Sequence, residues 1–135
     1  MEAFSPYGHA IASLAIWAFI VMVLTGLSTR GRVTDQRCGC GKPVRDYTNQ
    51  WYRSERAFMN AVEASGPFIG ATVAAILAGA VPFWVNLFAS VFIAARIVMA
   101  YVHIGTTNQP LRSTFWAVGV LCVTGLILLT LVAVL

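Results

Sequence analysis

Charged residues are scarce in this sequence. Only 10% of its 135 residues are Asp, Glu, Lys or Arg, whereas 59% are hydrophobic, and the mean hydropathy is +0.76. A soluble globular domain carries about 25% charged residues, so this composition excludes an ordinary soluble domain. We therefore expect one membrane domain that spans residues 1–135.

Cysteine is also scarce, and its pattern does not complete a structural zinc site. Cys38 and Cys40 lie two positions apart in Arg-Cys-Gly-Cys-Gly-Lys, whereas such a site takes four ligands. We expect a glycine-rich loop with exposed, reduced thiols, because the charge pattern described below assigns this loop to the cytoplasm. A metal shared between subunits is the alternative. Cys122 lies in an apolar run, where we expect it to fill space in the core.

Four apolar runs are each long enough to cross a bilayer, which takes roughly 20 apolar residues per helix. The second helix is expected to begin earlier than its apolar run, which leaves one loop at about 30–49. Asn108-Gln109-Pro110 is expected to form a turn, with Ser113 or Thr114 as the N-cap of the last helix. The sequence therefore predicts an all-α, up-down bundle of four membrane helices at about 9–29, 50–80, 82–104 and 114–134.

Basic residues concentrate between the first two helices: Arg30, Arg32, Arg37, Lys42, Arg45, Arg53 and Arg56. Arg112 lies between the last two helices, whereas the turn from Gly79 to Phe83 carries no charge. Lys and Arg accumulate in cytoplasmic loops of membrane proteins, so we expect residues 30–56 and 105–113 in the cytoplasm and both termini outside. Attraction to anionic lipid also fits this charge, and no nucleic-acid motif accompanies it.

Polar residues share one face near the start of the second helix. Arg56, Asn60, Glu63 and Pro67 follow one another at helical spacing, and at 100° per residue they occupy a narrow sector. Ionisable side chains within a membrane helix are costly to bury and are by default candidates for a functional site. Spacing alone leaves two interpretations open. One is an internal ion-pair network, for example Glu63 with Arg96, and the other is a ligand site.

Further polar residues lie towards the same end of the predicted bundle: Arg30, Arg96, His103, Arg112 and Ser113. Arginines outnumber carboxylates in this set, which suits an anionic ligand, because arginine binds carboxylates through paired hydrogen bonds. His103 on an apolar helix is more often a structural histidine than a ligand. A transporter or channel fits poorly, since no continuous polar path crosses the bundle. Composition and spacing thus predict a polar site at the cytoplasmic side.

Two stretches of the chain resemble the MAPEG family, the membrane-associated proteins in eicosanoid and glutathione metabolism. The first runs from Arg56 through Asn60 to Glu63 and continues with Pro67-Phe68. The second comprises Ala95-Arg96, Gly105 and the run Pro110-Leu111-Arg112-Ser113. Thr25-Gly26 followed by Arg30 is similar to the end of the family's first helix. The resemblance covers most of the chain and is to bacterial-type members.

The resemblance implies a homotrimer that binds glutathione in clefts between neighbouring subunits, open to the cytoplasmic side of a bacterial inner membrane. The binding residues that it implies are Arg30, Arg56, Asn60 and Glu63. Arg96 and His103, from the polar set described above, complete the candidate binding residues. Arg112 and Ser113 then lie beside the sulfur, where a cation and a hydrogen-bond donor lower the pKa of a thiol. The implied function is a glutathione-dependent transferase or peroxidase whose thiolate attacks a lipophilic electrophile from the bilayer.

Four positions depart from the family's pattern. Many members carry an arginine where this chain has Met59, and a histidine and a tyrosine where it has Met99 and His103. An aromatic hydroxyl that is common in the family is replaced by Trp116. These residues offer glutathione fewer hydrogen bonds. The alternative function is therefore a non-enzymatic MAPEG-like scaffold, which binds a lipid or a quinone-like molecule or is a subunit of a larger membrane complex.

Overall fold

The computed structural model of this chain describes residues 2–30 and 37–135. Its elements are a short 3-10 helix and four long helices: η1 (Glu2–Tyr7), α1 (Gly8–Arg30), α2 (Gln50–Leu77), α3 (Pro82–Gly105) and α4 (Gln109–Val134). Four helical segments are long and apolar enough to cross a membrane, and in the first of them η1 continues into α1. The all-α fold expected from the four apolar runs is confirmed.

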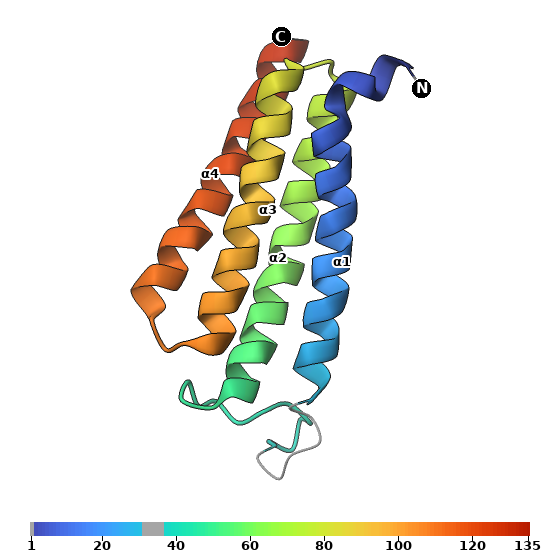
Figure 1. Cartoon of the computed structure of the whole chain (residues 1–135). Coiled ribbons are helices and arrows are strands. Elements are labelled where there is room, and N and C mark those ends of the chain that lie inside the picture. Colours follow the sequence, from blue (N-terminus) through green and yellow to red (C-terminus); the bar gives the residue numbers. More distant parts are fainter. Residues whose placement is uncertain (1, 31–36) are drawn as a thin grey trace.

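The four long helices lie side by side, with α2 and α3 between α1 and α4 (Figure 1). Residues 37–49, which precede α2, and the turn between α3 and α4 lie at one end of the bundle, which we call the loop end. The α2–α3 turn and both termini lie at the opposite end. Among the basic residues predicted for the loop end, Arg32 lies outside the described residues.

Asparagine side chains cap two helices at the loop end. Asn49 Oδ1 accepts a hydrogen bond from the Trp51 N–H at 2.8 Å, and α2 begins at Gln50. Asn108 Oδ1 accepts one from the Leu111 N–H at 3.0 Å, and α4 begins at Gln109. The prediction of a turn at 108–110 and a helix start near residue 114 is therefore wrong. Proline is compatible with a first helical turn, because its missing N–H has no partner to lose there.

Helix α2 ends at Leu77, three residues before the predicted end at residue 80, and a glycine in the following turn stops the helix. Gly79 has a φ of +67°, a left-handed conformation that costs glycine little. Its N–H bonds to the Ile76 carbonyl at 3.1 Å, which satisfies an acceptor at the helix end. Pro82 then starts α3. The chain reverses sharply here, so that α2 and α3 pack as antiparallel neighbours (Figure 1).

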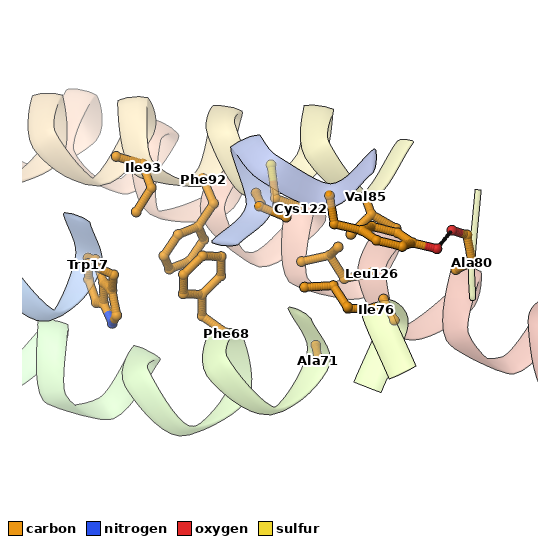
Figure 2. Packing of buried hydrophobic residues seen from close by; sticks show 14 of the residues in the cluster. Trp17, Phe68, Ala71, Ile76, Ala80, Val85, Phe92, Ile93, Cys122 and Leu126 are labelled. Atoms are coloured by element: carbon orange, nitrogen blue, oxygen red, sulfur yellow. Dashed lines mark hydrogen bonds between the residues drawn. The ribbon is translucent and has the colours of Figure 1, made fainter. Parts of the chain in front are cut away.

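Three aromatic side chains from different helices meet in the core (Figure 2). Phe68 of α2 and Phe92 of α3 stack with their ring centroids 3.9 Å apart. Trp17 of α1 packs edge-on against both rings, with centroid distances of 6.0 and 5.1 Å. Buried aromatic pairs contribute about 0.5–1.5 kcal/mol each beyond area burial. The cluster joins α1, α2 and α3 one turn of α3 away from Arg96.

Hydrogen bonds fix the start of the chain to the opposite end of the bundle. The Tyr7 hydroxyl donates to the Ala80 carbonyl at 2.6 Å (Figure 2). Asn86 of α3 accepts from the Ala10 N–H at 2.9 Å and donates to the Pro6 carbonyl at 2.8 Å. Hydrogen bonds between helices are stabilising within a bilayer, where water offers no alternative partner. These contacts hold η1 and α1 against the α2–α3 turn.

The structure corrects the prediction of reduced thiols in the α1–α2 loop. Cys38 and Cys40 form a disulfide, with their Cα atoms 5.2 Å apart. A tight turn brings them together, because the Gly41 N–H donates to the Cys38 carbonyl at 2.9 Å and the Cys38 N–H to the Lys42 carbonyl at 3.0 Å. Gly41 has a φ of +77° in this turn. Cys122 is a buried free thiol in α4, as expected for a packing residue.

Candidate functional site

Arg96 of α3 occupies the centre of the candidate site. The residue is buried, and its guanidinium lies over the Phe92 ring, 5.1 Å from the centroid. Its Nη1 donates to Asn60 Oδ1 at 2.8 Å and lies 3.4 Å from the Met99 sulfur. Its Nε has no hydrogen-bond partner among the described residues. A buried cation whose partners are neutral is costly, and it is therefore suited to bind an anion.

Gly119 of α4 leaves space for the Arg96 guanidinium. A Cβ atom at Gly119 would lie 3.0 Å from Arg96 Nε and 3.3 Å from its Cζ. Because a side chain there meets the guanidinium itself, the position of Arg96 depends on the close approach of the α4 backbone. Gly119 thus belongs to the supporting structure of the site.

Arg96 also lines a pocket of about 330 Å³ between α2 and α4. Asn60, Glu63 and Trp116 contribute to its lining, together with apolar side chains of α4 such as Val120. In the described part of the chain Glu63 forms no ion pair with Arg96, and Asn60 is the α2 residue that bonds to the guanidinium. The pocket therefore combines a buried cation, an amide and an exposed carboxylate.

His103 lines a second, much smaller cavity together with Asn60 and Arg96. This cavity has a volume of about 10 Å³, and Asn60, Arg96 and Met99 are among the residues that line it. Both ring nitrogens of His103 are buried without a hydrogen-bond partner among the described residues. A buried imidazole without partners is costly. His103 therefore adds two polar atoms to the interior beside Arg96.

Arg112 at the loop end is held by Tyr47. Its Nη1 donates to the Tyr47 hydroxyl at 2.8 Å, and its Cζ lies 5.7 Å from the centre of the tyrosine ring. The same ring contacts His103, with the two ring centroids 6.1 Å apart. Tyr47 therefore connects Arg112 on α4 with His103 on α3.

The segment that carries Tyr47 is anchored on both sides. The buried Arg53 donates from Nη1 to the carbonyls of Tyr47 and Thr48, at 2.9 and 2.7 Å. Its Nε donates to the Ile104 carbonyl at the end of α3 at 3.1 Å. Asp46 accepts bonds from the hydroxyl and the N–H of Thr48, at 2.7 and 2.9 Å. Both bonds lower the pKa of the Asp46 carboxyl, and the bond from the Thr48 hydroxyl has the larger effect.

Four predicted site residues are exposed in the single chain, and Glu63 of the larger pocket is one of them. Arg30 is the last residue of α1, and Ser113 follows Arg112 on α4. Arg56 lines a separate cavity that also includes Cys38 and Cys40. Asn60 and Arg96 line both cavities, the small one between α1, α2 and α3 and the larger one between α2, α3 and α4. Glu63 lines the larger cavity and His103 the small one, and Tyr47 contacts both His103 and Arg112.

The sequence pattern gave no indication of Tyr47, Arg53 or Glu55. Tyr47 lies in an irregular loop without hydrophobic periodicity, although Asp46 and Thr48 on either side are typical turn residues. Arg53 and Glu55 belong to the hydrophilic first turns of α2, and yet both are buried. Their burial depends on the fold of the preceding loop over these turns, which a local pattern does not contain.

The comparison with known proteins agrees with this architecture. The model of the MAPEG family matches residues 7–132, from the last residue of η1 almost to the end of α4. No match was found among curated proteins or among solved structures. This chain therefore belongs to the MAPEG family and is an integral, multi-pass membrane protein.

Proposed function

We propose that this protein is a glutathione-dependent membrane transferase or peroxidase that acts on lipophilic electrophiles. The observation that carries the proposal is the buried Arg96, which has neutral partners and lines the same pocket as Asn60 and Glu63. Glutathione has two carboxylates and one ammonium group. Arg96 suits a carboxylate, Glu63 suits the ammonium, and Asn60 can both donate and accept hydrogen bonds.

The exposure of charged residues on α2 supports a cleft between subunits. Arg56 and Glu63 belong to a helix that is apolar enough to span the membrane, and both are exposed in the single chain. A charge at the centre of a membrane helix costs about 2.5–3.5 kcal/mol on insertion scales, so this face of α2 is expected to meet another copy of the chain. We infer a homotrimer in which Arg30 and Arg56 close over glutathione at the subunit boundary.

Arg112 and Ser113 are the proposed activating residues. A free thiol has a pKa of roughly 8.5 and is mostly protonated at neutral pH. The guanidinium of Arg112 stabilises the thiolate electrostatically, and the Ser113 hydroxyl donates a hydrogen bond to the sulfur. The thiolate then attacks the electrophilic carbon or the peroxide oxygen of a substrate that enters from the bilayer. Tyr47 acts here as a positioning residue, because it holds Arg112.

Detergent-solubilised protein provides the test. We expect glutathione to bind, to show thiolate absorbance when bound, and to be conjugated to a hydrophobic halonitrobenzene. Arg112→Ala is expected to abolish the thiolate absorbance, whereas Arg112→Lys, which keeps the charge, is expected to retain part of it. Absence of binding at millimolar glutathione would contradict the proposal.

A lipid-binding or quinone-binding function without catalysis is the second candidate. An apolar groove of about 490 Å³ lies between α1 and α3, where Phe19, Leu24 and Tyr101 are among its lining residues. Such a groove suits an acyl chain or an isoprenoid tail. Co-purification of a lipid, a quinone or a stable membrane partner, together with no conjugation of generic electrophiles, would favour this scaffold role.

A further inference from the structure

A second polar cavity lies at the loop end, apart from Arg96. It has a volume of about 380 Å³ and includes both half-cystines of the α1–α2 loop in its lining. Its charged lining residues are Lys42, Arg45, Glu55 and Arg56. The cavity thus combines a disulfide, three cations and one carboxylate.

Glu55 is the carboxylate of this cavity, and it is incompletely paired. Its side chain is only 6% exposed, and its Oε1 lies 3.4 Å from Lys42 Nζ. Its Oε2 is buried and has no hydrogen-bond partner within the described residues. A buried carboxylate oxygen without a donor is costly in a fold. Glu55 nevertheless lines the cavity, so its carboxylate can accept a proton from a group that enters there.

The two sulfur atoms differ in their surroundings. Cys40 is exposed, whereas Cys38 is half-buried. The Cys40 N–H lies 3.3 Å from the Cys38 sulfur and can donate to it. In thiol–disulfide exchange the more accessible sulfur is attacked, and the better stabilised sulfur leaves as a thiolate. This asymmetry makes Cys40 the attacked atom and Cys38 the leaving group.

We propose that Cys38 and Cys40 form a thiol–disulfide exchange site for anionic low-molecular-weight thiols, with Glu55 as the proton-transfer group. A first thiolate bonds to the Cys40 sulfur, the Cys38–Cys40 bond breaks, and Cys38 keeps the electron pair. A second thiolate attacks the small-molecule sulfur of the mixed disulfide and releases Cys40 as a thiolate. Two thiols are thereby oxidised to one disulfide, and the protein is reduced to its dithiol.

Proton transfer completes this sequence of steps. Each incoming thiol gives up one proton to become a nucleophile, and each released cysteine thiolate takes one up, so that protons balance over the cycle. The Glu55 carboxylate accepts the proton and returns it within the cavity. A small-molecule disulfide reverses both steps and restores the Cys38–Cys40 bond, so the exchange needs no other oxidant.

The charge of the cavity favours thiols that carry carboxylates. Lys42, Arg45 and Arg56 all line it, and a concentration of one sign of charge raises the local concentration of small ions of the opposite sign. Glutathione is therefore expected to exchange faster than the neutral thiol mercaptoethanol. Arg56 also belongs to the glutathione cleft proposed above, but the exchange chemistry uses Cys38, Cys40 and Glu55 and not the pocket at Arg96. The exchange therefore does not depend on the function proposed above.

The first test measures the redox state of the pair in the full-length protein. The Cys122→Ala variant is used, because Cys38 and Cys40 are then the only cysteines in the sequence. The protein is equilibrated with defined mixtures of glutathione and its disulfide, alkylated, and analysed by mass spectrometry. We expect zero adducts in excess disulfide and two in excess glutathione. Two adducts in every mixture, or none in any, would overturn the proposal.

Single variants test the order of attack. In Cys38→Ser, glutathione disulfide is expected to form a mixed disulfide on Cys40. In Cys40→Ser, the half-buried Cys38 is expected to react about 10-fold more slowly, because exchange rates depend on access to the sulfur. Equal rates at the two positions would contradict the assigned roles.

Glu55→Gln tests the carboxylate. General acid–base catalysis contributes about 100-fold or more, so the rate of reduction by glutathione is expected to fall by that factor at neutral pH and to recover as the pH rises. Glu55→Asp, which keeps a carboxylate, should retain most of the rate. Asp46→Asn removes an exposed carboxylate of the same loop and should change the rate less than twofold. An unchanged rate in folded Glu55→Gln protein would contradict the role of Glu55.

The Cys38→Ser/Cys40→Ser double variant separates this proposal from the function proposed above. It lacks the exchange site but keeps Arg96 and Arg112, so it is expected to retain conjugation. Loss of exchange with conjugation intact supports two separate sites. Loss of conjugation in this variant would overturn their independence.

Discussion

Asn60 of α2 accepts a 2.8 Å hydrogen bond from Arg96 of α3. The bond links the two central helices at the level of the pocket, and it orients the guanidinium without neutralising its charge. Arg96 is thereby held in place by a dipole and remains available to an anion. Anion binding at this site depends on a guanidinium that is fixed in position and keeps its charge.

Replacing Arg96 with methionine is therefore expected to separate binding from stability. A hydrogen bond to a charged group contributes about 1.5–3 kcal/mol, so the Kd for glutathione should rise roughly 10- to 100-fold in Arg96→Met. Thermal stability in detergent should not fall, because an apolar replacement of similar volume is often neutral or stabilising at a buried charge. Calorimetric titration and thermal unfolding measure the two effects. Unchanged affinity in Arg96→Met would count against Arg96 as the anion-binding group.

Gly119→Ala tests the room that α4 leaves for Arg96. The new Cβ would lie 3.0 Å from Arg96 Nε, and an off-rotamer side chain costs about 0.5–1.5 kcal/mol. The Kd for glutathione should therefore rise roughly 2- to 10-fold. Gly26→Ala is the matched control on α1, since a Cβ there meets nothing within 4 Å. Similar affinities in the two variants would show that the guanidinium can move without weakening glutathione binding.

Tyr47→Phe tests the positioning of Arg112. The variant removes the hydroxyl that accepts from Arg112 Nη1 at 2.8 Å but keeps the ring. We expect kcat for conjugation to fall about 10-fold, consistent with the loss of a hydrogen bond to a charged group, while KM for glutathione changes little. Tyr101→Phe, at a position that is 75% exposed, is the control. An effect confined to KM would instead indicate a role of Tyr47 in binding.

Arg53→Ala is expected to weaken the fold at the loop end. Its three hydrogen bonds to the carbonyls of Tyr47, Thr48 and Ile104 are lost together. We expect the free energy of unfolding to fall by about 3 kcal/mol, because buried acceptors are left without donors. Denaturant titration in mixed micelles measures the change, with the exposed Arg45→Ala as the control. Equal stability of the two variants would mean that the Tyr47 segment is held by other contacts.

The fold was predictable from the sequence because a chain that crosses a bilayer must satisfy its backbone hydrogen bonds within each segment. Each membrane crossing needs a long apolar helix, and the four apolar runs therefore indicate the four helices and their alternating directions. Helix ends were less predictable. The cap at Asn108 moved the start of α4 to Gln109, because a side-chain hydrogen bond decides that boundary rather than hydrophobicity.

The candidate site was only partly predictable from spacing. Asn60 and Glu63 line one pocket, as their shared face suggests. The partner of Arg96 was not predictable, because opposite charge favoured Glu63 and the packing of α2 against α3 selected Asn60. The contact between Tyr47 and Arg112 joins residues 65 positions apart in the chain. The Cys38–Cys40 disulfide depends on a turn that the charge-based assignment of the loop did not consider.

A density map of the purified protein with glutathione shows directly whether neighbouring subunits enclose the ligand. We expect three copies of the chain, with a tripeptide in each cleft between neighbours. A carboxylate of this ligand should contact Arg96, and its sulfur should lie beside Arg112 and Ser113. A glutathione-saturated sample that shows a single copy, or a trimer whose clefts hold no tripeptide, would contradict the account.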